Sequence, residues 1–284
     1  MKVDYNEFIN NFFDGTDSFD NPDELINHIE KFNQMYDFEQ FEKEVELNEK
    51  VDYLMDKARK SKRKSTALKY AKEAYLLCPS CFESILFQAE IEDNPLKRIK
   101  ILEDGLKKEK NRLFENGHSN YENSFETRAY LIGLKTKALY LLQDGRIKEA
   151  ETICKELIHL SSHDLLGARY LLMAIYAYFE DINQFFAIYD EKSDSEIGAL
   201  FPLFVLHYKL GNEKEAKKTL KDIIHLYPSF LKYFKGSINL DKSIVLQEGY
   251  VKGTISELIA YFDMISFLMN TIPNIKYAIE EYSK

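Results

Sequence analysis

The sequence predicts an all-α protein in which helical hairpins stack into a solenoid. The first observation is an internal repeat: residues 145–163 (GRIKEAETICKELIHLSSH) recur 66 positions later as residues 211–229 (GNEKEAKKTLKDIIHLYPS), with eight identical positions. The second is a scarcity of helix breakers, because 284 residues contain only 6 prolines and 11 glycines. The third is the spacing, since 66 is twice 33, a period typical of helix-pair arrays.

The helical hairpins are expected from a small residue early in the second helix and a proline twelve positions later. Ala67 with Pro79 and Ala216 with Pro228 fit this spacing, Ala150 fits with Ser162 in the proline place, and Phe185 stands where the small residue would be. Apolar periodicity then predicts helices in chain order. These are residues 38–60, 82–91, 95–106, 125–143, 166–179, 183–189, 254–269 and 273–282, with a charged loop over 190–196 and a polar break over 107–124.

Charge divides the chain into segments. Residues 1–50 hold 14 acids and 4 bases, whereas the remainder is nearly neutral. We therefore expect an acidic helical N-terminal segment over 1–49, tetratricopeptide-like repeats over 50–236, and C-terminal helices over 237–284 that cap the solenoid. The acidic balance is a poor basis for nucleic-acid binding, which depends on neutralising phosphates.

The composition also predicts a location. The start, MKVDYNEFINNFF, lacks the basic and apolar regions of a signal peptide, and no apolar run is long enough to span a membrane. Three cysteines are too few for a disulfide framework and favour a reducing cytoplasm. Frequent Lys, Asn, Ile and Tyr are typical of AT-rich genomes and indicate a bacterial source.

Four segments carry a family resemblance. They are Glu126–Tyr130 (ETRAY), Asp164–Leu172 (DLLGARYLL), Tyr227–Phe234 (YPSFLKYF) and Ser256–Tyr261 (SELIAY), in that order. Over roughly residues 50–280 the chain resembles the tetratricopeptide family that includes the suppressor-of-tumorigenicity-seven proteins and many bacterial proteins. The resemblance implies a tetratricopeptide-like helical-hairpin solenoid, wound as a right-handed superhelix, with no assigned chemistry. The chain departs from the family's segments at Ala129, where relatives carry proline.

The candidates for chemistry are few. Cys78-Pro79-Ser80-Cys81 has the spacing of a redox pair or half a zinc site, but no strand precedes it and no second pair follows. His159 and His163 are four residues apart, yet His159 repeats as His225, which favours a role near a helix end. Phosphate-loop and nucleophile-elbow motifs are absent from the sequence. We expect no enzyme activity, no metal and no cofactor.

A basic run lies where the first hairpin should turn. It consists of Lys57, Arg59, Lys60, Lys62, Arg63 and Lys64. A solvated loop is the simpler interpretation. The alternatives are a phosphate-contacting or targeting patch and a partner for the acidic residues 1–49, which would then mask it.

The first helices of the hairpins should line a concave groove for a protein or peptide. Tyrosine offers large contact area with few rotors, and lysine can meet a carboxylate. The predicted lining is Lys135, Leu139, Leu142, Gln143, Tyr170, Ala174, Tyr178, Phe201, Val205, Tyr208 and Lys209. Arg169 falls at a normally buried position and needs a partner, for which Glu126 is the candidate.

The sequence thus predicts a non-catalytic scaffold or adaptor that binds a protein or peptide partner in the groove. One alternative is a peptide-sensing regulator with residues 1–50 as its effector. Another is a nucleic-acid-binding helical array that uses the basic run, although the overall charge makes nucleic acid an unlikely partner.

Overall fold

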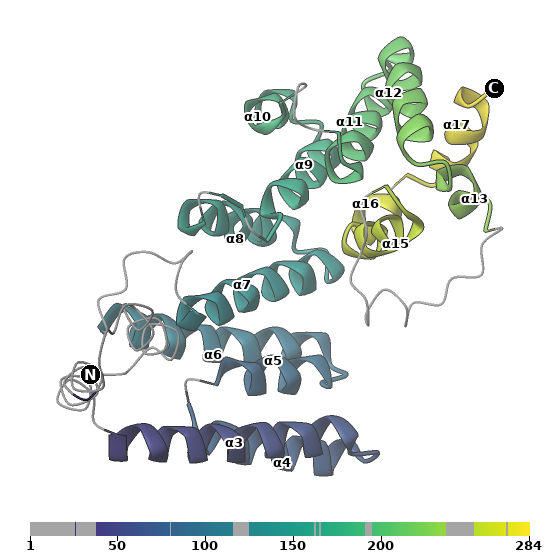
Figure 1. Ribbon diagram of the computed structural model, residues 1–284. Coiled ribbons are helices and arrows are strands. Elements are labelled where there is room, and N and C mark those ends of the chain that lie inside the picture. The colour runs from purple at the N-terminus through teal and green to yellow at the C-terminus, as the bar shows by residue number, and fades with distance from the viewer. Residues whose placement is uncertain are drawn as a thin grey trace. The chain divides into compact units, whose positions relative to one another are not determined.

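The structure is a computed structural model. It describes residues 26, 38–79, 81–115, 125–161, 163–164, 166–190, 195–236, 253–270 and 272–284. Within these ranges every regular element is an α-helix, and most successive helices pack against one another as in a helical repeat (Figure 1). None of the helices in the same ranges is long and apolar enough to cross a membrane. The chain divides into two compact units, Met1–Gln88 and Ala89–Lys284.

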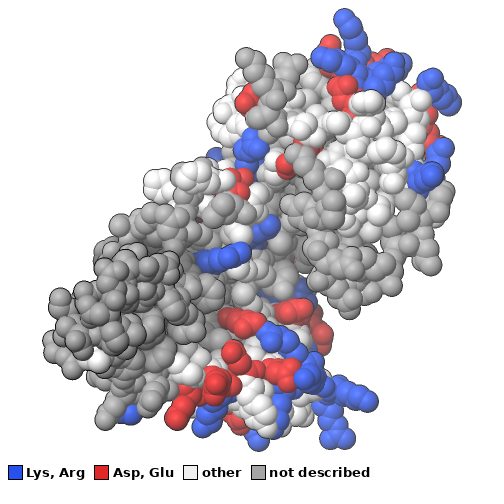
Figure 2. Space-filling view, in the orientation of Figure 1, with Lys and Arg blue, Asp and Glu red and all other residues white. Residues whose placement is uncertain are grey.

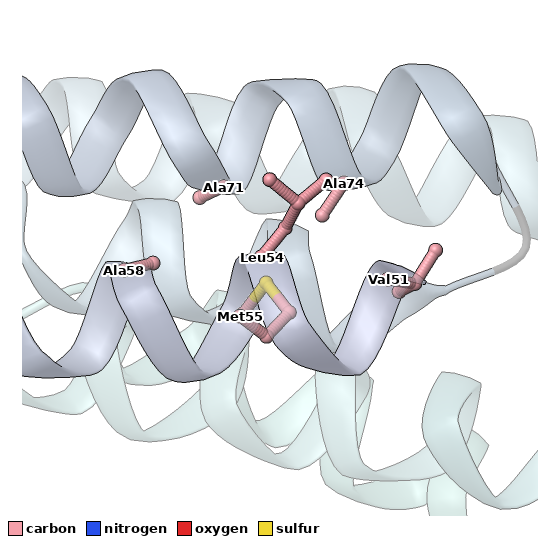
Figure 3. Packing of buried hydrophobic residues seen from close by; sticks show 6 residues of the cluster. All are labelled: Val51, Leu54, Met55, Ala58, Ala71 and Ala74. Carbon is pink, nitrogen blue, oxygen red and sulfur yellow. The ribbon is translucent and has the colours of Figure 1, made fainter. Parts of the chain in front are cut away.

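The first unit is centred on the hairpin of α3 (Phe38–Lys60) and α4 (Lys64–Leu77). The two helices pack closely because α4 turns alanines toward α3. Figure 3 shows the apolar cluster between them, which consists of Val51, Leu54, Met55, Ala58, Ala71 and Ala74. Helix α3 has the bounds that the periodicity predicts.

The second unit holds most of the helices. Helix α5 (Phe82–Glu90) crosses from the first unit into the second. The others are α6 (Pro95–Glu115), α7 (Phe125–Gln143), α8 (Ile147–Leu160), α9 (Ala168–Phe179), α10 (Ile182–Ile188), α11 (Ile197–Lys209), α12 (Glu213–Leu226), α13 (Phe230–Phe234), α15 (Ile255–Met264), α16 (Ser266–Asn270) and α17 (Ile275–Tyr282).

The three hairpins α7–α8, α9–α10 and α11–α12 turn in the same way. Each turn has one residue in the left-handed region, Gly145 (φ 77°), Glu180 (φ 59°) or Gly211 (φ 72°). In each, the amide of the next residue donates to the carbonyl five positions back, over 2.8–2.9 Å. This is the bond that closes a helix at a left-handed residue. The middle hairpin therefore repeats its neighbours although a glutamate replaces glycine.

The second helices of the hairpins differ at one equivalent position. The fourth residue is Ala67 in α4, Ala150 in α8 and Ala216 in α12, and all three are buried. In α10 the fourth residue is Phe185, whose side chain is fully buried. Helix α10 is also short, with 7 residues where α8 and α12 have 14.

Two segments differ from the sequence expectation in length. Helix α6 runs to Glu115 and takes up half of the predicted polar break, because its apolar stripe continues through Leu106 and Leu113, both buried. The helix expected over 254–269 is interrupted at Ile265, which separates α15 from α16. Predictions for residues 1–37, Ile26 aside, and for 237–252 fall outside the described residues.

A buried polar network holds the start of α11. Tyr227 accepts the amide of Ile197 at 2.8 Å and donates its hydroxyl to Glu257 at 3.0 Å. The same carboxylate accepts the Gly253 amide at 2.6 Å, and Tyr261 donates to the Gly198 carbonyl. Two of the segments that carry the family resemblance, 227–234 and 256–261, thus meet at one helix end and satisfy groups that burial would otherwise leave unpaired.

Candidate functional site

The face on which the sequence predicts a groove is partly covered by the chain's own C-terminal helices. Helix α15 packs on α11, and α16 packs on both α7 and α9. The rings of Tyr178 and Phe267 approach to 6.0 Å, and those of Tyr208 and Tyr282 to 6.3 Å. The helices expected to cap the end of the array therefore also contact the first helices of its hairpins.

Phe201 is a core residue, which corrects its assignment to the groove. Its side chain is 0% exposed and makes an edge-to-face contact with Phe262 of α15 at 4.7 Å. The reason is that α11 is apolar around its whole circumference, so that it is buried on several sides. The groove assignments of Leu142, Ala174 and Val205 are corrected in the same way, because all three are buried.

The two predicted groove lysines bind backbone carbonyls of this chain. Lys135 donates to the Leu166 carbonyl at 2.7 Å, and burial lowers the pKa of its ammonium. Lys209 donates to the carbonyls of Ala177 and Tyr178 and forms an ion pair with Glu180 at 3.1 Å. Lys209 thereby adds to the capping of the last turn of α9, where the Ala177 carbonyl also accepts the Glu180 amide at 3.4 Å.

The predicted groove tyrosines are half-buried and engaged within the chain. Tyr170 donates its hydroxyl to Glu196 at 2.7 Å, and its ring lies so close to Gly198 that a Cβ there would be 2.7 Å from the ring. The ring of Tyr208 also stacks on Phe204. Of the other predicted positions, Leu139 is half-buried and Gln143 is exposed.

Arg169 is half-buried rather than fully buried. Its guanidinium lies 5.0 Å from the centre of the Tyr170 ring and donates to the Tyr170 hydroxyl at 3.3 Å. The side chain of Glu126, its predicted partner, lies outside the described residues. The segment 164–172 has a second structural role, because both Asp164 oxygens accept backbone amides at the start of α9, from Ala168 and Arg169.

The basic run lies at the end of α3 and in the turn to α4. Lys57 lies over the ring of Tyr53 at 4.3 Å, Arg59 pairs with Glu83, and Lys60 pairs with Asp56 at 2.8 Å. Cations are favourable in the last turn of a helix. Figure 2 shows acidic and basic side chains intermingled where Figure 1 places this hairpin. Lys62, Arg63 and Lys64 are exposed.

The cysteine and histidine pairs have structural surroundings. Cys78 and Cys81 pack against the apolar cluster of the first unit, and burial raises the pKa of the Cys81 thiol. His159 and His163 do not share a helix face, because α8 ends at Leu160. Among the described residues, no three His, Cys, Asp or Glu side chains are placed to hold one metal ion.

An open cleft of about 580 Å³ lies on the opposite side of α11, between α10 and α12. We call it the α10–α12 cleft. Its volume is that of a typical ligand site. Its lining is Phe186, Tyr189, Ser195, Leu200, Leu203, His207, Glu215, Lys218, Thr219, Asp222, His225 and Leu226.

The cleft exists because α10 does not close against α11. Helix α8 packs on the next first helix, α9, whereas α10 packs on α9 and hardly touches α11 (Figure 1). Distances between helix axes depend on the side chains at the contact. Phe185 fills the place where Ala150 lets α8 approach its neighbours, and α10 ends after two turns.

The cleft combines an apolar surface with charged groups. Leu200 and Leu203 of α11, each 7% exposed, form its apolar floor. Phe186 (45% exposed) and Leu226 (42% exposed) also line the cleft and are accessible to solvent. Burial lowers the pKa of His207, against a smaller opposing effect of Glu215. Its Nδ1 is shielded from solvent without a hydrogen-bond partner among the described residues.

In comparisons with protein-family models and with curated proteins, no match to this chain is found. The tetratricopeptide resemblance therefore remains a prediction from the repeat and the four segments quoted above.

Sequence reasoning missed the α10–α12 cleft although two signals for it were present. Phe185 breaks the alanine rule of the second helices, and Asp190 follows only a few residues later in a charged stretch. Together they indicate a second helix that is both short and held away from its neighbour. Most of the residues predicted to line the groove, by contrast, contact other residues of this chain.

Proposed function

We propose that this protein is a non-catalytic interaction scaffold or adaptor of the cytoplasm that binds a partner protein or peptide. The observation that carries the proposal is the α10–α12 cleft, where apolar and charged groups share one open concave surface. Apolar pockets with a few polar groups are the usual form of binding sites. The proposed site thus moves from the inner face, where α15 and α16 lie, to the opposite side of α11.

The proposed architecture is a tetratricopeptide-like solenoid with a right-handed superhelix. Three consecutive hairpins with the same turn geometry support it, as do the alanines at the fourth position of three second helices. Stacked hairpins of this kind present extended surfaces for partners.

Affinity purification from the native host, followed by mass spectrometry, tests the function. The cleft variant is Phe186→Ala/Leu226→Ala, and the control is Leu76→Ala/Tyr277→Ala, which removes two residues that are 78% and 73% exposed elsewhere. We expect a protein that wild type and control retain and the cleft variant loses. Recovery of the same proteins with all three would contradict the proposal.

A further inference from the structure

The internal repeat shows that two carboxylates of the α10–α12 cleft lack the partners that their counterparts have. Glu149 of α8 pairs with Arg146 at 2.6 Å, and Glu156 pairs with Lys110 of α6 at 2.9 Å. The residues 66 positions later are Glu215 and Asp222, which both line the cleft. Glu215 accepts the Thr219 hydroxyl through its backbone carbonyl, but neither side-chain carboxylate makes a hydrogen bond or ion pair within the part of the chain that the structure describes.

The charges around the cleft leave it acidic. Burial lowers the pKa of His207, which disfavours its charged form, and Lys218 is the lysine of the lining. The other lysines of α12, Lys214, Lys217 and Lys221, lie outside the lining. The lining thus holds two carboxylates and one ammonium beside the imidazoles of His207 and His225, so a cationic group of a ligand gains favourable interactions at the two carboxylates.

Aromatic and aliphatic surface lies beside these carboxylates. Phe186 is 45% exposed, and its ring contacts those of Phe185, Tyr189 and His207. No cation of the described residues lies over this ring, whereas Lys148 lies over the Phe179 ring at 4.0 Å. An aromatic face attracts a lysine or arginine head group. Together with Leu226, which is 42% exposed, the ring also offers apolar area for an aliphatic or aromatic anchor above the buried Leu203.

The shape of the cleft fits a short helix. Helix α10 has 7 residues where α8 and α12 have 14, so among the described residues this second helix is shorter by seven residues, roughly 10 Å in length. A helix laid on α11 between α10 and α12 would occupy the place that a full-length second helix takes elsewhere. Apolar anchors three or four positions apart on such a helix would reach the leucines of α11.

We propose that the α10–α12 cleft binds a basic amphipathic helical segment of a partner protein, with an apolar anchor against Phe186 and Leu203 and a lysine or arginine at Glu215 and Asp222. This rests on the proposed function, because it names the partner chemistry of the same site. The segment completes the layer that α10 leaves open.

Selection of a random 12-residue peptide library on the full chain tests the proposal, with Phe186→Ala as the counter-selection. We expect enriched peptides with Leu or Phe and with Lys or Arg three or four positions away, and loss of binding to the variant. Circular dichroism melting of the variant verifies its folding. Enriched peptides without basic residues that still need Phe186 would overturn the basic class and leave the cleft as a binding site. If no peptide is enriched, or if the enriched peptides bind the variant equally well, both the basic ligand class and the cleft as a binding site are overturned.

A matched pair of charge variants then locates the cationic group. Glu215→Gln/Asp222→Asn should weaken an enriched peptide about tenfold or more, which corresponds to 1.4 kcal/mol. Glu149→Gln/Glu156→Gln changes the repeat counterparts and should alter binding less than about twofold. The affinity should also fall as salt is raised. Equal effects of the two variants would contradict the assigned carboxylates.

Discussion

Helices α8 and α10 occupy the same place in consecutive hairpins but leave different surfaces. Both follow turns with the same backbone bonds. Helix α8 carries Ala150 at its fourth position and packs on α9, whereas α10 carries Phe185, is half as long, and leaves a cleft over α11. The fourth residue and the length of the second helix thus decide whether that helix packs on the first helix of the next hairpin.

Helices α8 and α12 provide the complementary case, because their sequences are similar and their surroundings are not. Glu149 and Glu215 are equivalent in the repeat, yet the first is paired with Arg146 and the second faces the cleft. Repetition in the sequence therefore preserves the helix and its buried face, while the role of an exposed residue depends on which helix lies beside it.

The largest expected effect is at Phe185. Phe185→Ala should lower the free energy of unfolding by about 3–5 kcal/mol, because it empties a fully buried aromatic site between α10 and α9. Urea unfolding followed by circular dichroism measures it. Phe186→Ala is the control and should cost less than about 1 kcal/mol, since nearly half of that side chain is exposed. Equal losses would mean that α10 is not anchored by Phe185.

The next largest effect on stability should distinguish Tyr227 from Ser161, which occupy equivalent positions of the repeat. Tyr227→Phe should cost about 1–3 kcal/mol, because the Ile197 amide loses its acceptor and Glu257 loses a donor. Ser161→Ala should be neutral or slightly stabilising, since the buried Ser161 hydroxyl has no hydrogen-bond partner among the described residues. Thermal unfolding measures the stability of both variants. A larger loss of stability for Ser161→Ala than for Tyr227→Phe would contradict this prediction.

A smaller effect is the dependence of the free energy of unfolding on pH, to which His207 should contribute. Because burial disfavours the imidazolium, its pKa in the folded protein lies below the ordinary 6.5. The unfolded chain then takes up this proton first, so the free energy of unfolding decreases as the pH falls from 6.5 toward the folded-state pKa. Titration of the imidazole by NMR measures that pKa. In Glu215→Gln it should drop further, because the nearby carboxylate raises it; an unchanged pKa would place Glu215 away from His207.

The smallest effect concerns the paired and unpaired glutamates. Glu149→Gln removes a solvent-exposed ion pair and should cost about 0.3 kcal/mol, and less at high salt. Glu215→Gln should cost nothing measurable, because its carboxylate has no ion-pair partner among the described residues. Denaturant midpoints at low and high salt compare the two variants. A salt-dependent loss in Glu215→Gln alone would reverse the assignment of paired and unpaired positions.

The fold class was predictable because its signals are local. The spacing of apolar residues located α3 and α7 with the bounds that the structure has, and Gly145 and Gly211 located two hairpin turns. Each signal depends on a few neighbouring residues whose backbone geometry is decided by periodicity or by a left-handed turn.

The sequence by itself therefore determined where most of the described helices lie and where the α7–α8 and α11–α12 hairpins turn, but it did not predict α13 (Phe230–Phe234) or the interruption between α15 and α16. Only the tertiary structure decided what covers each face. Residues such as Phe201 and Lys209, predicted at an open groove, instead contact Phe262 of α15 and the carbonyls that end α9. The α10–α12 cleft opened where α10 stops short of α11. Helical periodicity is encoded within one segment, whereas exposure depends on distant segments that compete for the same apolar surface.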